Sequence, residues 1–182
     1  MCIGLQCRSI LSISTAMAVM QTFDAIIGLG SNIGDKQANI ARAIENLTAD
    51  GALKLVARSR DYRSAPWGKT DQDWFVNACI SVTTNLTAHE VLERCFAAER
   101  ALRRVRQERW GPRTLDCDLL VFRDVILNTP ELTLPHPRIT DRAFVLVPML
   151  EIAPDLVIKG RKISDWLRSL DSTDVVVCSE PH

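Results

Sequence analysis

The sequence predicts one domain in which strands and helices are mixed, and three observations lead to this expectation. The chain has 182 residues, 47% hydrophobic and 24% charged, which is typical of a globular protein with a sizeable core. Apolar runs bounded by turn residues alternate with segments whose apolar residues recur every three or four positions, and these patterns are typical of strands and helices respectively. No internal repeat or low-complexity linker divides the chain. We therefore expect residues 23–182 to form a single domain.

Residues 1–22 do not share this organisation. Arg8 precedes a short apolar stretch that superficially matches a secretion signal, but three hydroxyl residues dilute this stretch and only one basic side chain precedes it. Met20 lies just before the first clear strand. We expect residues 1–22 to be an N-terminal extension that is disordered or loosely packed.

Charge and cysteine content argue against several classes of protein. Lys plus Arg and Asp plus Glu balance at 22 each, so no net charge draws the chain to nucleic acid or to a membrane surface. No apolar run reaches the length of a membrane span. The six cysteines lack zinc-type spacing, and reduced, mostly buried thiols in a cytosolic protein are the simplest interpretation. We expect a cytoplasmic protein without a nucleic-acid or membrane partner.

The first strand and helix are predicted by clear local signals. Residues 24–30 form an apolar run that ends in a Gly-Ser-Asn turn, where the serine and asparagine can be simple turn residues. Asp35 can cap the helix that follows, in which Ile40, Ile44 and Leu47 recur at helical spacing.

Two further strands are expected at residues 53–62 and 74–84, with a polar loop at 64–73 between them. Asn77 interrupts the apolar pattern of the later strand and therefore needs a polar partner in the fold or in a ligand. Trp67 in the loop is either a hydrophobic latch onto the core or a platform for a ligand, with about even odds.

A helix is expected from Ala88 to about Val105, because Thr87-Ala-His-Glu90 has the sequence of a capping box. One stripe of this helix carries Leu92, Cys95, Phe96, Glu99 and Leu102. Glu99 thus falls on the buried face. It can form an internal salt bridge with Arg103 or act as a site carboxylate facing the arginines.

The most informative stretch is residues 109–122, in which two arginines surround a Gly-Pro turn and a strand follows. Because successive strand side chains alternate between faces, Asp116 and Asp118 should point the same way, roughly 6.5–7 Å apart. Leu120 and Phe122 should continue that face. The residues expected on the other face are Leu115, Cys117, Leu119 and Val121.

Two carboxylates so close would repel each other in an apolar setting unless a cation lay between them. Mg²⁺ is the natural candidate, since it prefers oxygen ligands and takes the remainder from water and substrate phosphates. Arg109 and Arg113 are suited to those phosphates, because a guanidinium matches a phosphate bidentately. The stretch therefore predicts a metal–phosphate site.

The last third of the chain adds one candidate residue and two helices. Prolines on both sides of His136 keep its backbone out of any helix, and with Arg138 and Arg142 nearby it is a candidate for phosphate contact. Short helices are expected at residues 141–150 and 163–170.

Taken together, these motifs resemble those of the 6-hydroxymethyl-7,8-dihydropterin pyrophosphokinase family, whose members transfer diphosphate from ATP to a pterin alcohol. The resemblance covers roughly residues 24 to 160 and implies a ferredoxin-like α+β fold with an antiparallel-rich sheet flanked by helices. The matching motifs are Gly30-Ser31-Asn32, Pro66-Trp67-Gly68, Asn77-Ala78, the run from Arg109 to Asp118, Leu134-Pro-His136 and Arg142-Ala-Phe144.

The resemblance also assigns site residues. Asp116 and Asp118 are expected to hold two Mg²⁺ ions and, with Arg104 and Arg113, to be catalytic. The expected ATP-binding residues are Glu99, Arg106, Trp110, Arg113, His136 and Arg142. The expected pterin-binding residues are Ser64, Ala65, Trp67, Phe75, Asn77, Trp110 and Phe144. Loops 62–73 and 103–114 are expected to be lids that become ordered when nucleotide binds.

Two other functions fit the sequence less well than the pyrophosphokinase function. A ferredoxin-like sheet with an arginine-rich segment could bind single-stranded RNA, but no RNA-binding signature motif is present and the paired aspartates would repel phosphate without a metal. A pterin-binding protein without catalysis would not need both aspartates and the arginines. The expected partners are therefore ATP and hydroxymethyl-dihydropterin. The protein is expected to be a monomer.

Overall fold

The computed structural model describes residues 23–66, 71–102 and 113–179. Its centre is a six-stranded sheet in which β10, β3, β4, β1 and β5 follow one another, and β2 also pairs with β4. Every pairing in the described sheet is antiparallel. The strands are β1 (Ala25–Ser31), β2 (Leu53–Arg58), β3 (Tyr62–Ser64), β4 (Phe75–Thr84), β5 (Asp116–Phe122) and β10 (Val176–Val177).

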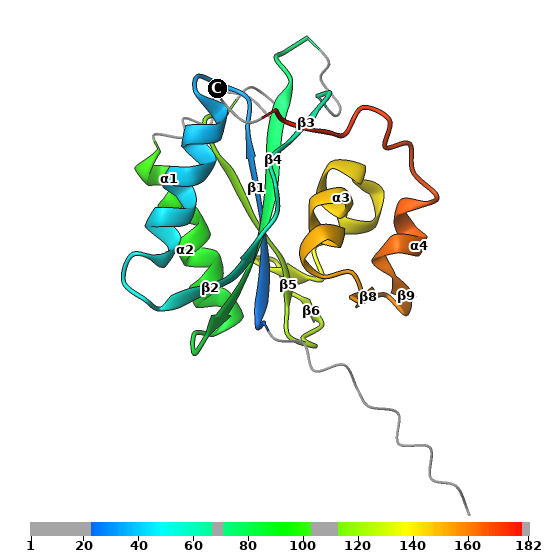
Figure 1. The fold of residues 1–182 in the computed structure, drawn as a ribbon. Coiled ribbons are helices and arrows are strands. Elements are labelled where there is room, and N and C mark those ends of the chain that lie inside the picture. Colours follow the sequence, from blue (N-terminus) through cyan, green and yellow to red (C-terminus); the bar gives the residue numbers. More distant parts are fainter. Residues whose placement is uncertain (1–22, 67–70, 103–112, 180–182) are drawn as a thin grey trace, which may run out of the picture.

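Helices cover both faces of this sheet (Figure 1). On one face lie α1 (Lys36–Thr48) and α2 (Ala88–Ala101), and on the other α3 (Ala143–Ile152) and α4 (Ile163–Leu167). Each face has its own hydrophobic core, one containing Ile40 of α1 and the other Leu146 of α3. The predicted α+β fold with an antiparallel sheet flanked by helices is confirmed.

Short elements lie between β5 and α3 and between α3 and α4. They are β6 (Leu127–Asn128), β7 (Thr133–Leu134), the 3-10 helix η1 (Ile139–Asp141), β8 (Val157–Ile158) and β9 (Arg161–Lys162). Within the described residues, no helix has both the length and the apolar character needed to span a membrane.

The starts of α1 and α2 have the hydrogen bonds that the capping motifs predict. Asp35 accepts a hydrogen bond from the backbone N–H of Ala38 at 3.1 Å, at the start of α1. At α2, the Thr87 hydroxyl accepts from the N–H of Glu90, while the Glu90 carboxylate accepts from the N–H of Thr87 at 2.7 Å. These bonds satisfy donors that the helix itself leaves unpaired, and both predictions are confirmed.

The predicted alternation along β5 holds only as far as Leu120. Register slips between Ile26 and Ile27 of β1, which pair with Val121 and Leu119, so Leu120 is an extra residue on β5. Such a bulge places consecutive side chains on one side of the strand. Val121 therefore packs with Leu120 on the α3 face, and Phe122 packs on the α1–α2 face. The predicted faces of Val121 and Phe122 were wrong.

The single strand expected at residues 53–62 is in fact two strands. The chain leaves the sheet ladder after Arg58 and re-enters it at Tyr62, and both parts pair with β4. Ser59 lies in the break, where its hydroxyl accepts from the N–H of Cys79 at 2.9 Å and so replaces a ladder bond. The C-terminal tail, which carried no clear pattern, adds β10 to the edge of β3.

The expected helix bounds differ slightly from the observed ones. The helix expected at 141–150 is observed as η1 followed by α3, and the helix expected at 163–170 ends at Leu167. The N-terminal extension at 1–22 and the end of the helix expected near Val105 lie outside the described residues.

Candidate active site

A pocket lies between the α3 side of the sheet and the start of α3. Its volume is about 700 Å³, including the solvent-filled space at its opening. Strands β1, β4 and β5 form its floor, and Arg142, Phe144 and Val145 form one wall. The predicted site residues that line it are Ser64, Ala65, Phe75, Asn77, Arg113, Asp116, Asp118, Arg142 and Phe144. The fold thus brings together residues from four separate regions of the sequence.

Asp116 and Asp118 share the pocket face of β5, as the alternation predicts. Among the described residues, each carboxylate pairs with an arginine. Asp116 Oδ2 lies 2.9 Å from Arg113 Nη1, and Asp118 Oδ2 lies 3.5 Å from Arg142 Nη1. The aspartate side chains nevertheless stay 29% and 37% exposed. Both carboxylates therefore remain accessible from the pocket while their charges are partly compensated.

This donor set fits Mg²⁺. Among the described residues, no group of three or more His, Cys, Asp or Glu side chains gathers as a closed metal site. The carboxylates of Asp116 and Asp118 can supply some of the ligands and leave coordination positions for water and phosphate oxygens. That arrangement is the usual one for Mg²⁺ at nucleotide sites.

A buried asparagine and a glycine line another part of the pocket. Asn77 is 6% exposed, and its Nδ2 donates to the Ser64 hydroxyl at 2.8 Å. A Cβ built on Gly30 would lie 3.2 Å from Asn77 Oδ1, 3.7 Å from Asp116 Cβ and 4.0 Å from Phe75 Cδ1. A larger residue at position 30 would therefore fill the space between these three side chains, which the glycine leaves open.

Two aromatic side chains border this space from different elements. Phe75 comes from the start of β4 and Phe144 from the first turn of α3. The Arg142 guanidinium carbon lies 5.7 Å from the centre of the Phe144 ring, within the range of a cation–π contact. Phe144 and Arg142 thus connect the aromatic part of the pocket with the charged part.

Sequence reasoning missed Cys79 as a pocket residue. It lies two positions after Asn77 on β4, so strand alternation alone could have placed it on the same face. Its thiol donates to the Val145 carbonyl oxygen at 3.8 Å, and burial raises the pKa of Cys79 well above its ordinary value. The pocket floor is therefore lined here by a neutral thiol.

His136 lies near the charged part of the site. Burial lowers its pKa from 6.5 to about 4, the guanidinium groups of Arg142 and Arg138 lower it as well, and the Asp116 carboxylate opposes them. His136 Nδ1 accepts from the backbone N–H of Arg138 at 3.3 Å. Since Nδ1 accepts, the proton of the neutral imidazole sits on Nε2, where it can be donated to a ligand.

Glu99 lies on the other side of β5, facing the sheet from α2. It is 5% exposed, and its Oε1 accepts from the backbone N–H of Cys117 at 3.0 Å. Cys117 is the residue between Asp116 and Asp118, so this bond supports the strand that carries both carboxylates. The expected ATP contact of Glu99 stays a prediction.

Several predicted site residues lie outside the described residues. These are Trp67, Arg104, Arg106, Arg109 and Trp110, together with residues 67–70 of one expected lid loop and 103–112 of the other. Arg103, the possible salt-bridge partner of Glu99, lies outside them as well. The loop expected to begin at residue 62 begins after β3, because Tyr62–Ser64 pair with β4.

Comparison with known proteins agrees with this geometry. Residues 26–154 match the profile of the 7,8-dihydro-6-hydroxymethylpterin-pyrophosphokinase (HPPK) family. A 2-amino-4-hydroxy-6-hydroxymethyldihydropteridine pyrophosphokinase of Methylorubrum extorquens is 52% identical over 151 residues, which span 83% of this chain and 96% of that protein. The enzyme of the same name from Synechocystis is 39% identical over 85% of this chain and 80% of its own length.

The fold is similar to that of solved HPPK-DHPS structures. The wild-type Plasmodium falciparum protein with pteroate superposes with a TM-score of 0.64 at 14% identity, over 81% of this chain. The match spans 42% of that longer chain, and at this identity it bears on the fold alone. Pocket, fold and sequence relatives lead to one conclusion: the chain belongs to the HPPK family.

Proposed function

We propose that this chain transfers diphosphate from ATP to 6-hydroxymethyl-7,8-dihydropterin and releases AMP, using the pocket between β5 and α3. This is the pyrophosphokinase reaction of its family, a step of folate biosynthesis. One observation carries the assignment: Asp116 and Asp118 line the same pocket as Phe75, Asn77 and Phe144. This shared lining supports a site in which phosphate and a flat ring are held next to each other.

In this proposal, the carboxylates of Asp116 and Asp118 hold two magnesium ions. When bound, these ions would neutralise the phosphate oxygens and favour attack at phosphorus. The protein's own contribution is to hold the polyphosphate and the alcohol in line and to provide fixed positive charge. No covalent intermediate on the protein is required.

Arg113, Arg142 and His136 are proposed to contact the polyphosphate. Arg113 pairs with Asp116 and Arg142 with Asp118, so an incoming phosphate can share their guanidinium donors. Burial lowers the pKa of Arg142, but an arginine remains charged at neutral pH. His136 adds an uncharged donor through Nε2.

The pterin is proposed to stack against Phe75 and Phe144 and to be read by Asn77. Because Asn77 Nδ2 is held by the Ser64 hydroxyl, its orientation is fixed and Oδ1 is left to accept from an N–H donor on the pterin edge. The space beside Gly30 would receive the ring. Ser64 and Ala65 complete that end of the pocket.

We further propose that the enzyme acts as a monomer in the cytoplasm, with residues 23–182 as one domain. One continuous sheet with helices on both faces supports the single domain (Figure 1).

The metal assignment is tested by measuring binding of an unreactive ATP analogue as Mg²⁺ is titrated. We expect Asp116→Ala and Asp118→Ala each to weaken the magnesium-dependent part of binding and to lower turnover by at least about 100-fold, while circular dichroism shows the same fold. Asp155→Ala is the matched control, since this aspartate pairs with Lys162 at 3.1 Å and does not line the pocket. Wild-type magnesium dependence and turnover in either site variant would refute the assignment.

A further inference from the structure

The floor of the pocket consists of two rows of paired residues that run across β4, β1 and β5. They are Asn77, Gly30 and Asp116 in the first row, and Cys79, Gly28 and Asp118 in the second. Because β1 contributes a glycine to each row, no side chain rises from the middle of the floor. The floor is therefore a trough, with the amide and the thiol along one edge and the two carboxylates along the other.

Leu120 closes this trough at its inner end, beside Gly28. The three atoms nearest to a Cβ built on Gly28 all belong to the Leu120 side chain, with Cδ1 at 3.0 Å, Cγ at 3.4 Å and Cδ2 at 3.6 Å. Leu120 is fully buried and lines the pocket together with Val145. The space that a side chain at position 28 would occupy is therefore filled by carbon atoms of this leucine.

The bulge in β5 explains why Leu120 lies there. The register with β1 passes from Leu119 directly to Val121, so Leu120 has no paired residue on β1. A bulge re-aims the side chains of its strand. On the opposite edge of the strand, the Leu120 carbonyl oxygen accepts from the backbone N–H of His136 at 2.8 Å. The backbone of the bulge is thus held from outside the β1 pairing, while the side chain of Leu120 lies against Gly28.

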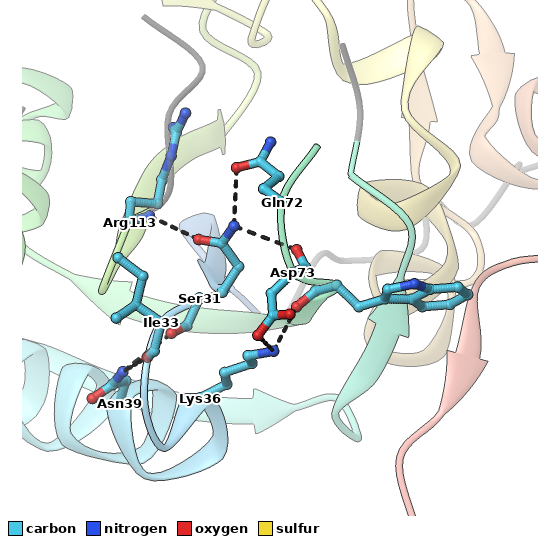
Figure 2. Close-up of polar contacts among 9 residues, drawn as sticks. Ser31, Ile33, Lys36, Asn39, Gln72, Asp73 and Arg113 are labelled. Carbon is cyan, nitrogen blue, oxygen red and sulfur yellow. Dashed lines mark hydrogen bonds and ion pairs between the residues drawn. The ribbon is translucent and has the colours of Figure 1, made fainter. Parts of the chain in front are cut away.

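The surroundings of Leu120 leave the pocket as the direction in which its side chain can be displaced. Strand β1 is paired along both edges. Asn39 of α1 also holds the end of β1, since its Nδ2 donates to the Ser31 hydroxyl at 3.1 Å and to the Ile33 carbonyl at 2.9 Å (Figure 2). On the α3 side, Leu120 belongs to the same buried core as Ile26. Protein cores are close-packed, so a group added at Gly28 should push Leu120 toward the pocket.

We propose that Leu120 is a positioning residue for the pterin, because its side chain, held against Gly28, is the wall at which the stacked ring stops. This inference rests on the assignment of the pocket made above. The wall keeps the hydroxymethyl group next to Asp116 and Asp118, where the alcohol meets the polyphosphate. A misplacement of about 1 Å can slow a reaction by about 100-fold. The wall therefore acts on turnover as well as on affinity.

The first test uses two substitutions that act on the same space. Gly28→Ala places a methyl group 3.0 Å from Leu120 Cδ1 and displaces Leu120 into the pocket. We expect the pterin dissociation constant to rise by about 10-fold or more, the effect of one excess methylene in an apolar pocket. Adding Leu120→Ala to Gly28→Ala removes the displaced side chain and should return the constant to within about 3-fold of the wild-type value.

Binding is measured by isothermal titration of hydroxymethyl-dihydropterin in the presence of magnesium and α,β-methylene-ATP, whose blocked bond prevents transfer. If Gly28→Ala acted only by damaging the strand, a second substitution in the core would weaken binding further. Recovery of affinity in the double variant therefore identifies the space that the two residues share.

The second test is the turnover of Leu120→Ala alone. We expect kcat to fall by about 10-fold or more, and by a larger factor than KM rises, because the ring can enter beyond its productive position. Leu119→Ala is the matched control, since Leu119 is an equally buried leucine that packs on the α1–α2 face and does not line the pocket. It should also lower the unfolding free energy but leave kcat and KM close to the wild-type values.

The outcomes distinguish the wall from the pocket. A folded double variant that binds pterin no better than Gly28→Ala overturns the role of Leu120, and so do equal losses of kcat in Leu119→Ala and Leu120→Ala. If the variants with Leu120→Ala do not fold, Leu120→Val, which removes one carbon from the side chain, replaces it in both tests. A wild type that does not bind hydroxymethyl-dihydropterin overturns the assignment of the pocket itself.

Discussion

Replacing His136 with asparagine should change how the stability of the protein depends on pH. In the folded protein, burial lowers the pKa of His136 from 6.5 to about 4. The unfolded chain therefore binds a proton at pH values where the native state does not. The resulting stabilisation is fully present above pH 6.5 and is lost as the pH falls toward 4.

The size of the effect follows from these two values. A pKa of about 4 against 6.5 corresponds to a loss of roughly 2 kcal/mol in unfolding free energy between pH 7 and pH 5, and roughly 3 kcal/mol by pH 4. Asparagine cannot titrate, but its side-chain oxygen can still accept from the N–H of Arg138, as Nδ1 does at 3.3 Å. The substitution therefore removes the proton-binding site and keeps the local bond.

The assay is denaturant unfolding at several pH values from 4 to 7, with His89→Asn as the control. His89 lies exposed in the first turn of α2, so this variant controls for the loss of a histidine at the surface. Carboxylates also titrate in this range, but the difference between the wild type and His136→Asn isolates His136. Parallel stability profiles for these two proteins would refute the buried, neutral state of the imidazole.

Three further substitutions test separate parts of the structure. Phe144→Ala should weaken pterin binding by about 10-fold or more, as loss of one stacking face does, with a smaller effect on nucleotide; equal losses would contradict the stacking role. Glu99→Ala should lower the unfolding free energy by about 1–3 kcal/mol, because the buried N–H of Cys117 loses its acceptor. Glu99→Gln keeps an acceptor oxygen and should retain most of this stability. A Glu99→Gln protein as unstable as Glu99→Ala would contradict the role of this hydrogen bond. Glu151→Ala removes the acceptor of the Tyr62 hydroxyl at 2.7 Å. It should lower the unfolding free energy by about 1–3 kcal/mol and leave turnover unchanged. A large loss of turnover would show that this pair acts on the site.

The parts of the fold that follow local rules could be predicted from the sequence. The caps at Asp35 and Thr87 were visible because each requires only a few neighbouring residues. The common face of Asp116 and Asp118 followed from strand alternation over three residues.

Features that depend on distant partners could not be predicted in this way. The bulge at Leu120 arises from register with β1 and reverses the expected faces of Val121 and Phe122. Pairing of β10 with β3 depends on a segment of more than one hundred residues between them. Asn32 looked like a turn residue, because nothing in its neighbourhood shows that Gln72 and Arg113 would converge on it.

The most direct test of the central proposal is the identity of the nucleotide product. The protein is incubated with ATP, Mg²⁺ and 6-hydroxymethyl-7,8-dihydropterin, and the reaction is followed by ³¹P NMR. Transfer of diphosphate should yield AMP and a pterin diphosphate in equal amounts, with no reaction when Mg²⁺ is omitted. Formation of ADP, or release of AMP without phosphorylated pterin, would contradict the account.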